Sequence, residues 1–207
     1  MPREQVYFEP PPEAESLKKL QRIGAHDARF AAVFERSVFR ELAGSLLGTP
    51  AVPGNLQCFN KPPGVGKPMP PHQDGYHFML EPCEPVMMCL ALDDVDEEND
   101  PVRYVPRSHG RGMRPHARKE TLGFSQGIVD DGTTADTESE IAFPTREGDL
   151  LAHHAPTIHR LEESRSETRQ RRASGFIYCS SEAHADSAAH ETYQRELAVK
   201  LVGEERI

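Results

Sequence analysis

Residues 55–92 read NLQCFNKPPGVGKPMPPHQDGYHFMLEPCEPVMMCLAL. Short runs of β-branched, aromatic and aliphatic residues alternate here with prolines, glycines and acidic residues, a pattern typical of short strands joined by turns. The pattern continues to about residue 180 and favours an all-β barrel or sandwich. The strands that it predicts span residues 56–59, 76–80, 86–92, 102–105, 140–143, 150–153 and 174–179.

The segment before this β-rich region has a different period. Leu17, Leu20 and Ile23 recur at helical spacing, and apolar residues continue that spacing from Phe30 to Leu47. We therefore expect two amphipathic helices that pack onto an apolar surface. Residues 61–71 and 111–139 show little periodicity, so they are expected to form long loops at the mouth of a site.

The length of 207 residues fits a single domain. We expect residues 1–207 to form one catalytic unit, with a helical part over residues 1–50 and a β core over residues 55–180. The tail is expected to form one more helix through Tyr193, Leu197 and Leu201.

The composition points to small-molecule partners. A formal net charge of −9 argues against binding to nucleic acid or to an anionic membrane, because both favour clustered Lys and Arg. The stretch from Met1 is polar and proline-rich, without an apolar core, and no run of about 18 apolar residues follows, so no passage to or through a membrane is expected. The four cysteines lack the spacing of a zinc site and the density of a disulfide scaffold, so a reducing cytoplasm is expected.

The segment from Pro71 to Gly75 carries the first candidate for chemistry. His72 and Asp74 stand two residues apart at the entrance to a predicted strand. Residues i and i+2 of a strand face the same side, so both side chains can bind one metal ion. A third ligand candidate, His159, ends the later stretch GDLLAHHAPTIH. Two histidines and one carboxylate are the facial set that holds non-haem iron and leaves positions open for a keto acid and oxygen.

A site of that kind also needs a cation for the far carboxylate of a bound keto acid. Arg169, Arg171 and Arg172 follow His159 by about the length of one strand and turn. The same three arginines also fit a solvated basic cluster that balances nearby glutamates. Composition alone does not separate these two interpretations.

Several separated motifs, in this order, resemble the phytanoyl-CoA dioxygenase family. They are NKPPG at residues 60–64, PHQDG at 71–75, ALDDVDEEN at 91–99, RYVPRSH at 103–109, the stretch from 148 to 159, and RRA at 171–173.

The resemblance implies a mainly β fold, the double-stranded β-helix or cupin-like jelly roll, with the N-terminal helices packed on it. It implies that His72, Asp74 and His159 bind Fe(II) and that Arg171 pairs with 2-oxoglutarate. Gln73 matches a residue that helps to bind 2-oxoglutarate. His154 matches a second family histidine that is not a ligand, so a structural role is expected for it. The implied reaction is hydroxylation of a small organic substrate by O2, with conversion of 2-oxoglutarate to succinate and CO2.

Two alternatives of other classes stay open. The first is a metal-binding, cupin-like isomerase, or a 2-oxoglutarate-binding protein without oxygenase turnover. The second is a structural barrel in which His72, Asp74 and His159 do not converge. Neither the substrate nor the oligomeric state can be inferred from these residues.

Overall fold

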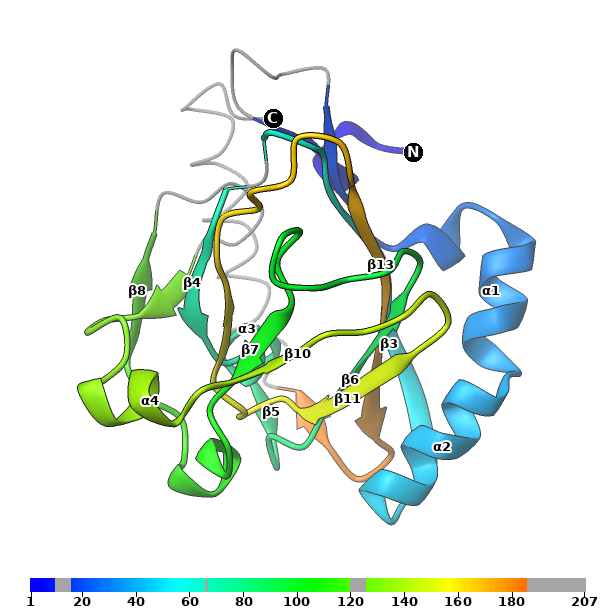
Figure 1. Ribbon diagram of the computed structural model, residues 1–207. Coiled ribbons are helices and arrows are strands. Elements are labelled where there is room, and N and C mark those ends of the chain that lie inside the picture. Colours follow the sequence, from blue (N-terminus) through cyan, green and yellow to red (C-terminus); the bar gives the residue numbers. More distant parts are fainter. Residues whose placement is uncertain (10–15, 66, 120–125, 186–207) are drawn as a thin grey trace.

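Two antiparallel β-sheets face each other and form the body of the protein (Figure 1). This computed structural model describes residues 1–9, 16–65, 67–119 and 126–185. Within these ranges, the major sheet has the strand order β1 (Val6–Phe8), β2 (Leu17–Leu20), β3 (Ala51–Lys61), β13 (Arg171–Ser180), β6 (Val86–Ala91) and β11 (Leu150–His154). The minor sheet has the order β10 (Ile141–Phe143), β7 (Val102–Tyr104), β12 (His159–Leu161) and β4 (Met69–His72).

The strands that pair are mostly distant in sequence. β13 lies between β3 and β6, and β12 lies between β7 and β4. This two-layer antiparallel arrangement agrees with the predicted jelly roll. The other elements are α1 (Ala28–Glu35), α2 (Val38–Leu47), α3 (Gly75–Phe78), α4 (Thr134–Ser139), the strand pair β5 (Leu80–Glu81) and β14 (His184–Ala185), the strand pair β8 (His116–Arg118) and β9 (Gln126–Ile128), and short 3-10 helices at Arg3–Gln5, Ile23–Ala25 and Ser108–Arg111.

Helices α1 and α2 begin and end at residues suited to these positions. The Asp27 carboxylate accepts a hydrogen bond from the Arg29 amide, and the Ser37 hydroxyl accepts one from the Phe39 amide. These bonds satisfy N–H groups that the first turn of a helix leaves free. Helix α2 ends at Gly48, whose φ of 71° suits glycine better than any other residue.

The two helices cover the outer face of the major sheet, as predicted (Figure 1). Phe39 stacks on Phe176 of β13 with ring centroids 4.5 Å apart. The Tyr178 hydroxyl donates a 2.8 Å hydrogen bond to the Phe34 carbonyl. The apolar cluster between helices and sheet contains Ile23, Phe34, Ala43, Ala51, Leu56, Val86, Met88, Phe176 and Tyr178.

The inner face of the major sheet has a different character. Met87 and Cys89 of β6, together with Arg171 and Ala173 of β13, line a pocket between the sheets. Met88 of β6 and Phe176 and Tyr178 of β13 belong instead to the outer cluster. This follows from the two-residue period of side chains along a strand. One sheet therefore serves both the apolar core and the pocket.

Two segments differ from the sequence-based prediction. Residues 17–20 form strand β2 rather than a helix and pair with β1 and β3. The Leu17 and Leu20 spacing imitates a helix, but the residues between them, Lys18 and Lys19, are buried in the structure. Helix α3 takes up most of the predicted strand 76–80, because the chain turns immediately after His72.

The segments predicted as loops also contain regular structure. Strand β4 begins in the proline-rich segment 61–71 and ends at His72, and β8, β9 and α4 lie between residues 111 and 139. Thr133 and Asp136 form a reciprocal capping box at the start of α4. The helix predicted in the tail falls outside the described residues.

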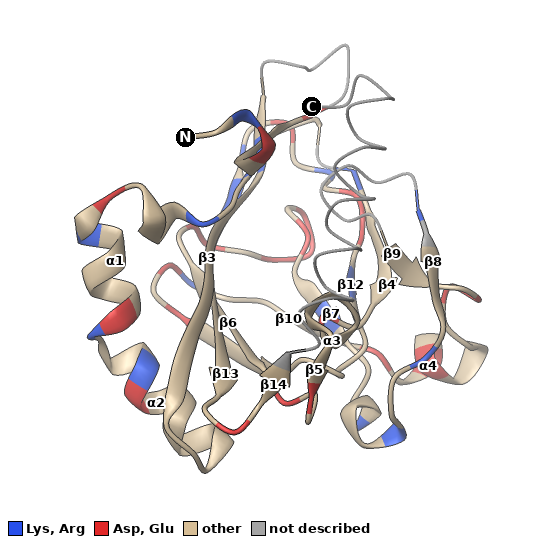
Figure 2. Ribbon diagram, turned by 180° about the vertical axis from the view of Figure 1, so that it is seen from behind, with Lys and Arg blue, Asp and Glu red and all other residues tan. Residues whose placement is uncertain are grey.

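Charged residues of both signs are distributed over the protein. Figure 2 shows Lys and Arg interspersed with Asp and Glu along α1, α2 and the loops. Among the described residues, no helix is both long enough and apolar enough to cross a membrane. All four cysteines, Cys58, Cys83, Cys89 and Cys179, lie in the described part and are unpaired.

Replacing Phe176 by alanine tests the contact between helices and sheet. Phe176→Ala should lower the free energy of unfolding by about 3–5 kcal/mol, because it leaves a cavity in the outer cluster. Phe30 of α1 is 44% exposed, so Phe30→Ala should change that energy by less than about 0.5 kcal/mol. Urea denaturation of the two variants measures both values, and similar losses would contradict the packing described here.

Candidate metal centre

Strand pairing in the minor sheet brings two distant histidines together. His159 of β12 lies opposite His72 of β4 on one side and opposite Tyr104 of β7 on the other. The three side chains therefore form one row across the sheet, and the two imidazole rings have centroids 4.1 Å apart. Residues 72 and 159 meet only because β12 inserts between β4 and β7.

Asp74 enters the site from the turn that follows β4. It occupies the first position before α3, and the Gly75 amide donates a 3.1 Å hydrogen bond to the Ala155 carbonyl, which holds the turn against the loop before His159. A Cβ atom at Gly75 would lie 2.5 Å from the Cys83 sulfur, so glycine is needed for this close packing.

The predicted metal ligands converge. His72, Asp74 and His159 each offer a ligand atom, and these atoms all lie within 4.8 Å of one another. His72 Nε2 lies 3.6 Å from Asp74 Oδ1, and His159 Nε2 lies 3.7 Å from Asp74 Oδ2. This geometry contradicts the alternative of a structural barrel with scattered residues.

Backbone carbonyls orient both imidazoles. His72 Nδ1 lies 3.0 Å from the Pro70 carbonyl oxygen, and His159 Nδ1 lies 3.0 Å from the Thr157 carbonyl oxygen. A carbonyl can only accept, so Nδ1 must carry the proton in each ring. Each Nε2 then keeps its lone pair for a metal ion, as in metal-binding histidines whose other nitrogen is held by a hydrogen bond.

The protonation states also suit a cation. Burial lowers the pKa of His159 to about 4 and brings that of His72 well below its ordinary value. Burial opposes ionisation of Asp74, but His159 and a hydrogen bond from His153 hold the pKa of this carboxyl well below its usual range. At neutral pH the site therefore holds two neutral imidazoles and one carboxylate, the forms that bind metal.

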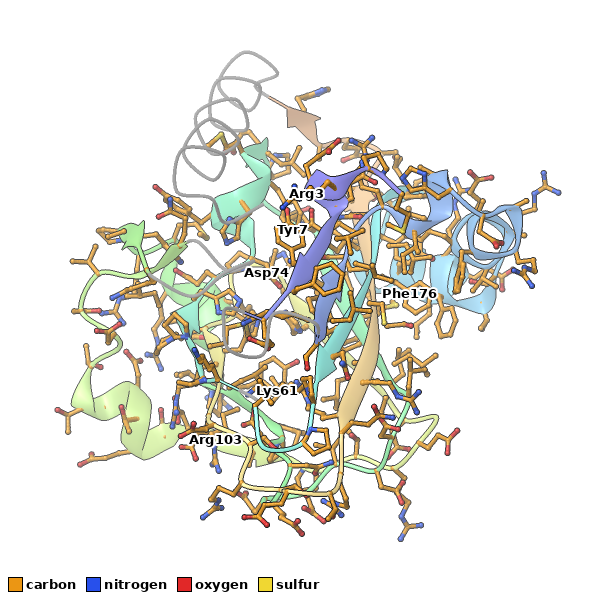
Figure 3. The ribbon with its side chains drawn as sticks, turned by 90° about the horizontal axis from the view of Figure 1, so that it is seen from above. Arg3, Tyr7, Lys61, Asp74, Arg103 and Phe176 are labelled. Atoms are coloured by element: carbon orange, nitrogen blue, oxygen red, sulfur yellow. The ribbon has the colours of Figure 1, made fainter. Side chains whose placement is uncertain are left out.

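The three residues lie at the wall of a pocket between the sheets. Figure 3 shows Asp74 and Lys61 in this space and Phe176 on the side of α1 and α2. The pocket volume is about 80 Å³, below the roughly 300–1,000 Å³ typical of pockets for drug-sized ligands. A ligand held wholly inside must therefore be small. The apolar lining includes Phe59, Met69, Met87, Val102, Leu161 and Ala173.

Two cations of the pocket wall have protein partners. Lys18 forms a 3.1 Å ion pair with Glu9, and both side chains are almost fully buried. Lys61 forms a 2.5 Å ion pair with Asp100, which is also buried. These pairs compensate the cost of removing the charges from water.

Arg171 is different. It is 9% exposed and lines the same pocket, yet no carboxylate within the described ranges pairs with its guanidinium. Its Nε atom is buried without a hydrogen-bond partner. An unpaired buried guanidinium is costly, and it indicates a place for an anion.

The other two candidate arginines lie elsewhere. Arg169 pairs with Asp96 at 2.6 Å, and Arg172 pairs with Asp93 at 2.7 Å. Neither of them lines the pocket. The basic-cluster interpretation therefore describes Arg169 and Arg172, and Arg171 stands apart from it.

Gln73 is fully buried between loops. Its Nε2 donates to the carbonyl oxygens of Gly112 and Pro156, and its Oε1 accepts from the Arg114 amide. Both of its N–H groups are thus used within the protein. The predicted contact with 2-oxoglutarate stays a prediction, and this geometry favours a role for Gln73 in joining the loops behind the metal site.

Sequence reasoning missed His153 and Tyr104. His153 Nε2 lies 3.0 Å from Asp74 Oδ2, and His153 Nδ1 lies 3.0 Å from the Tyr104 hydroxyl. The adjacent His154, singled out from the sequence, lines a separate groove beside His109 on the outer side. Strand alternation over residues 150–153 was a usable signal, because it places consecutive histidines on opposite faces.

Comparisons with known proteins agree with this geometry. The family model described as phytanoyl-CoA dioxygenase (PhyH) matches residues 4–173. The phytanoyl-CoA dioxygenase domain-containing protein 1 of Mus musculus is 28% identical over 161 residues, which are 76% of this chain and 55% of the mouse protein. The chain thus spans about half the length of the curated relatives it matches.

Solved structures share the fold. The non-haem, alpha-ketoglutarate-dependent carbocyclase SnoK from nogalamycin biosynthesis superposes with a TM-score of 0.70 at 22% identity, covering 92% of this chain and 76% of that chain. The epimerase SnoN, solved in complex with Fe³⁺ and alpha-ketoglutarate, gives a TM-score of 0.67 at 19% identity, covering 88% of this chain and 71% of that chain. The predicted cupin-like jelly roll is confirmed.

The metal-free protein should lose stability as the pH falls. His72 and His159 are buried and His77 is half-buried, and burial lowers each pKa, to about 4 for His77 and His159. In the unfolded chain each imidazole binds a proton near pH 6.5. Between about pH 6.5 and 4 the unfolded state therefore binds more protons, and each histidine lowers the free energy of unfolding by up to about 1.4 kcal/mol per pH unit.

Urea denaturation of the metal-free protein between about pH 7 and pH 5 measures this slope. His77→Asn should flatten it by about one proton. His26 serves as a control, because it is exposed in the folded protein and lies far from the metal centre in the sequence; His26→Asn should leave the slope unchanged. A slope that does not change in His77→Asn would contradict the assignment.

Proposed function

This chain belongs to the phytanoyl-CoA dioxygenase family, and from that premise we propose that it is an Fe(II)- and 2-oxoglutarate-dependent dioxygenase. The proposed reaction is hydroxylation of a small organic substrate. The observation that carries the proposal is the convergence of His72, Asp74 and His159 beside the unpaired Arg171. Family membership alone would suggest the class of reaction, but it would not identify the residues of this chain that take part.

The donor set fits iron. Two neutral imidazoles and one carboxylate form the facial ligand set of non-haem Fe(II) oxygenases, which leaves positions open on the metal. In this chain His72, Asp74 and His159 would hold the ion through Nε2, a carboxylate oxygen and Nε2. The carboxylate at position 74 fills a ligand position that chloride would otherwise need, which favours hydroxylation over halogenation.

Arg171 would bind the carboxylate of 2-oxoglutarate that lies away from the metal. Its guanidinium can donate two parallel hydrogen bonds to a carboxylate. The buried and unpartnered Nε of Arg171 is the atom that such an anion would satisfy. The same arrangement explains why Arg169 and Arg172, each already paired, are not needed in this role.

Iron(II) and 2-oxoglutarate together supply the oxidation of a substrate C–H bond by O2, with release of succinate and CO2. The chain supplies the geometry. Backbone carbonyls hold His72 and His159 in the correct tautomer, and Arg171 fixes the far end of the cosubstrate. The apolar side chains Phe59, Met87 and Leu161 exclude water from the space beside the ligands, which limits side reactions.

The outcome of the oxidation is a separate matter. Solved structures with this fold include a carbocyclase and an epimerase, both described as alpha-ketoglutarate dependent. A ring closure or an epimerisation at the same centre is therefore a second candidate. Labelled ¹⁸O₂ distinguishes them, since hydroxylation places one labelled oxygen in the product and the other two reactions place none.

The proposed cosubstrate site can be tested without knowing the substrate. Under strict anaerobiosis, protein with Fe(II) and 2-oxoglutarate should show the weak visible charge-transfer band of an iron-chelated keto acid. Arg171→Ala should raise the concentration of 2-oxoglutarate needed for half the band by about 10- to 100-fold, since hydrogen bonds to a charged group contribute about 1.5–3 kcal/mol.

Arg172→Ala is the matched control, because it removes a neighbouring guanidinium that is exposed and paired with Asp93. It should change the required concentration by less than about threefold. His72→Ala should abolish the band by removing a ligand. If the parent protein binds Fe(II) but forms no band, the 2-oxoglutarate assignment fails and the metal-binding isomerase takes its place.

A further inference from the structure

One histidine of the pocket is neither a predicted ligand nor a surface residue. His153 lies on β11, at the edge of the major sheet, yet its side chain reaches across the sandwich to the minor-sheet side. Its ring is 6% exposed and lies between the Asp74 carboxylate and the Tyr104 hydroxyl, 3.0 Å from each. It therefore connects the two sheets at the metal centre.

The partners determine where the ring carries its proton. Asp74 is ionised and can only accept, so His153 Nε2 must donate to Asp74 Oδ2. In the neutral ring Nδ1 then accepts, and the Tyr104 hydroxyl must donate to it. Tyr104 can do so because it keeps its proton, since burial raises its pKa well above the ordinary value. The chain of donors runs from Tyr104 through His153 to Asp74.

The hydrogen bonds from Tyr104 through His153 reach only one of the two carboxylate oxygens of Asp74. Oδ2 lies 3.0 Å from its donor His153 and 3.7 Å from His159 Nε2, whereas Oδ1 has no hydrogen-bond donor among the described residues and lies 3.6 Å from His72 Nε2. The backbone gives the carboxylate no such anchor, because Asp74 makes no side-chain cap to α3. An unsupported carboxylate could rotate about its side-chain bonds and meet a metal through either oxygen or both.

We propose that His153 is a positioning residue, which holds Asp74 through Oδ2 so that Oδ1 alone binds the metal, and that Tyr104 fixes the His153 ring. The proposal rests on the metal site of the proposed function. Hydrogen bonds of this kind to a ligating carboxylate or imidazole typically change metal affinity or activity by about 10–100-fold when they are removed. Fewer oxygens from Asp74 also leave more positions for 2-oxoglutarate and O2.

The rival role for His153 is that of a third histidine ligand. The group of atoms that lie within 4.8 Å of one another contains His72, Asp74 and His159 but not His153. The Nε2 of His153 also carries the proton that Asp74 accepts, so it has no lone pair for a metal. Both observations favour positioning over ligation.

Metal titration of single-residue variants tests the proposal. His153→Phe keeps a ring and removes the donor, and it should weaken Mn(II) binding measured by calorimetry by about 10- to 100-fold. His153→Gln restores an N–H donor and should return to within about threefold of the parent. His154→Phe, one residue along the strand and directed to the opposite face, is the matched control and should bind Mn(II) as the parent does. Tyr104→Phe should show a smaller loss than His153→Phe.

A second readout separates positioning from ligation. In the Cu(II)-loaded protein, the nitrogen hyperfine pattern in electron paramagnetic resonance should show two imidazoles in both the parent and His153→Phe. Loss of one nitrogen in the variant would show that His153 is a ligand, and unchanged Mn(II) affinity would show that it has no role at the site. Either result overturns the proposal.

Misfolding and failure of the wider assignment are both distinguishable outcomes. Thermal unfolding of each metal-free variant checks the fold, and if His153→Phe does not fold, the comparison of His153→Gln and Tyr104→Phe with the parent still decides the case. Mn(II) binding uses no 2-oxoglutarate. A parent that binds Mn(II) but gives no charge-transfer band would therefore refute the oxygenase assignment and leave the result on His153 intact.

Discussion

The antiparallel pairing of β12 with β4 is the interaction on which the site depends. It places His159 beside His72 although the two residues belong to separate parts of the sequence. A shift of the register by one residue would turn His159 to the outside, because side chains alternate along a strand. β7 limits such a shift from the other side, since it pairs Tyr104 with the same histidine. Backbone hydrogen bonds thus set the geometry that a metal ion requires.

The pocket wall combines apolar side chains with charged ones, and most of the buried cations in it are paired with buried acidic residues. Lys18 pairs with buried Glu9, and Lys61 pairs with buried Asp100. These two lysines make the wall polar, but their charges are already compensated within the protein. The Arg171 guanidinium is the exception among the buried cations of the described residues that line the pocket. Burying an unpaired guanidinium destabilises the folded protein because the charge loses its hydration. A bound anion would offset this destabilisation. A charged residue in a pocket wall therefore indicates a ligand only when it has no partner within the protein.

The mainly β core and the proximity of His72 and Asp74 could be predicted from the sequence, but the second partly for an incorrect reason. Asp74 was expected to share a strand with His72, whereas it lies immediately before α3. Strand β4 could not be recognised, since Met69–His72 includes two prolines, which weaken any strand pattern. Strand β2 looked helical because its buried lysines interrupt the apolar alternation that marks a strand.

Long-range partners account for most of what the sequence did not reveal. Arg169 pairs with Asp96 and Arg172 pairs with Asp93, whereas Arg171 has no such partner among the described residues. The two aspartates lie more than seventy positions before these arginines in the chain. Nothing local distinguishes the three arginines. His153 and His154 are a different case, since the period of a strand separates them once the strand is placed. The choice between them required only the register of β11.

The distance along the chain between His72 and His159, 159 − 72 = 87 positions, also affects how the protein folds. Contacts between distant residues carry a loop-closure cost that must be met before they stabilise anything, which slows the folding of β-sandwiches. His72 and Asp74 lie near each other in any conformation and can meet a metal early and weakly. His159 joins them only after β12 has inserted between β7 and β4. Tight binding of a metal by all three residues would thus report that the last strands of the minor sheet have assembled, and metal supplied during folding would stabilise the finished sandwich rather than its early intermediates.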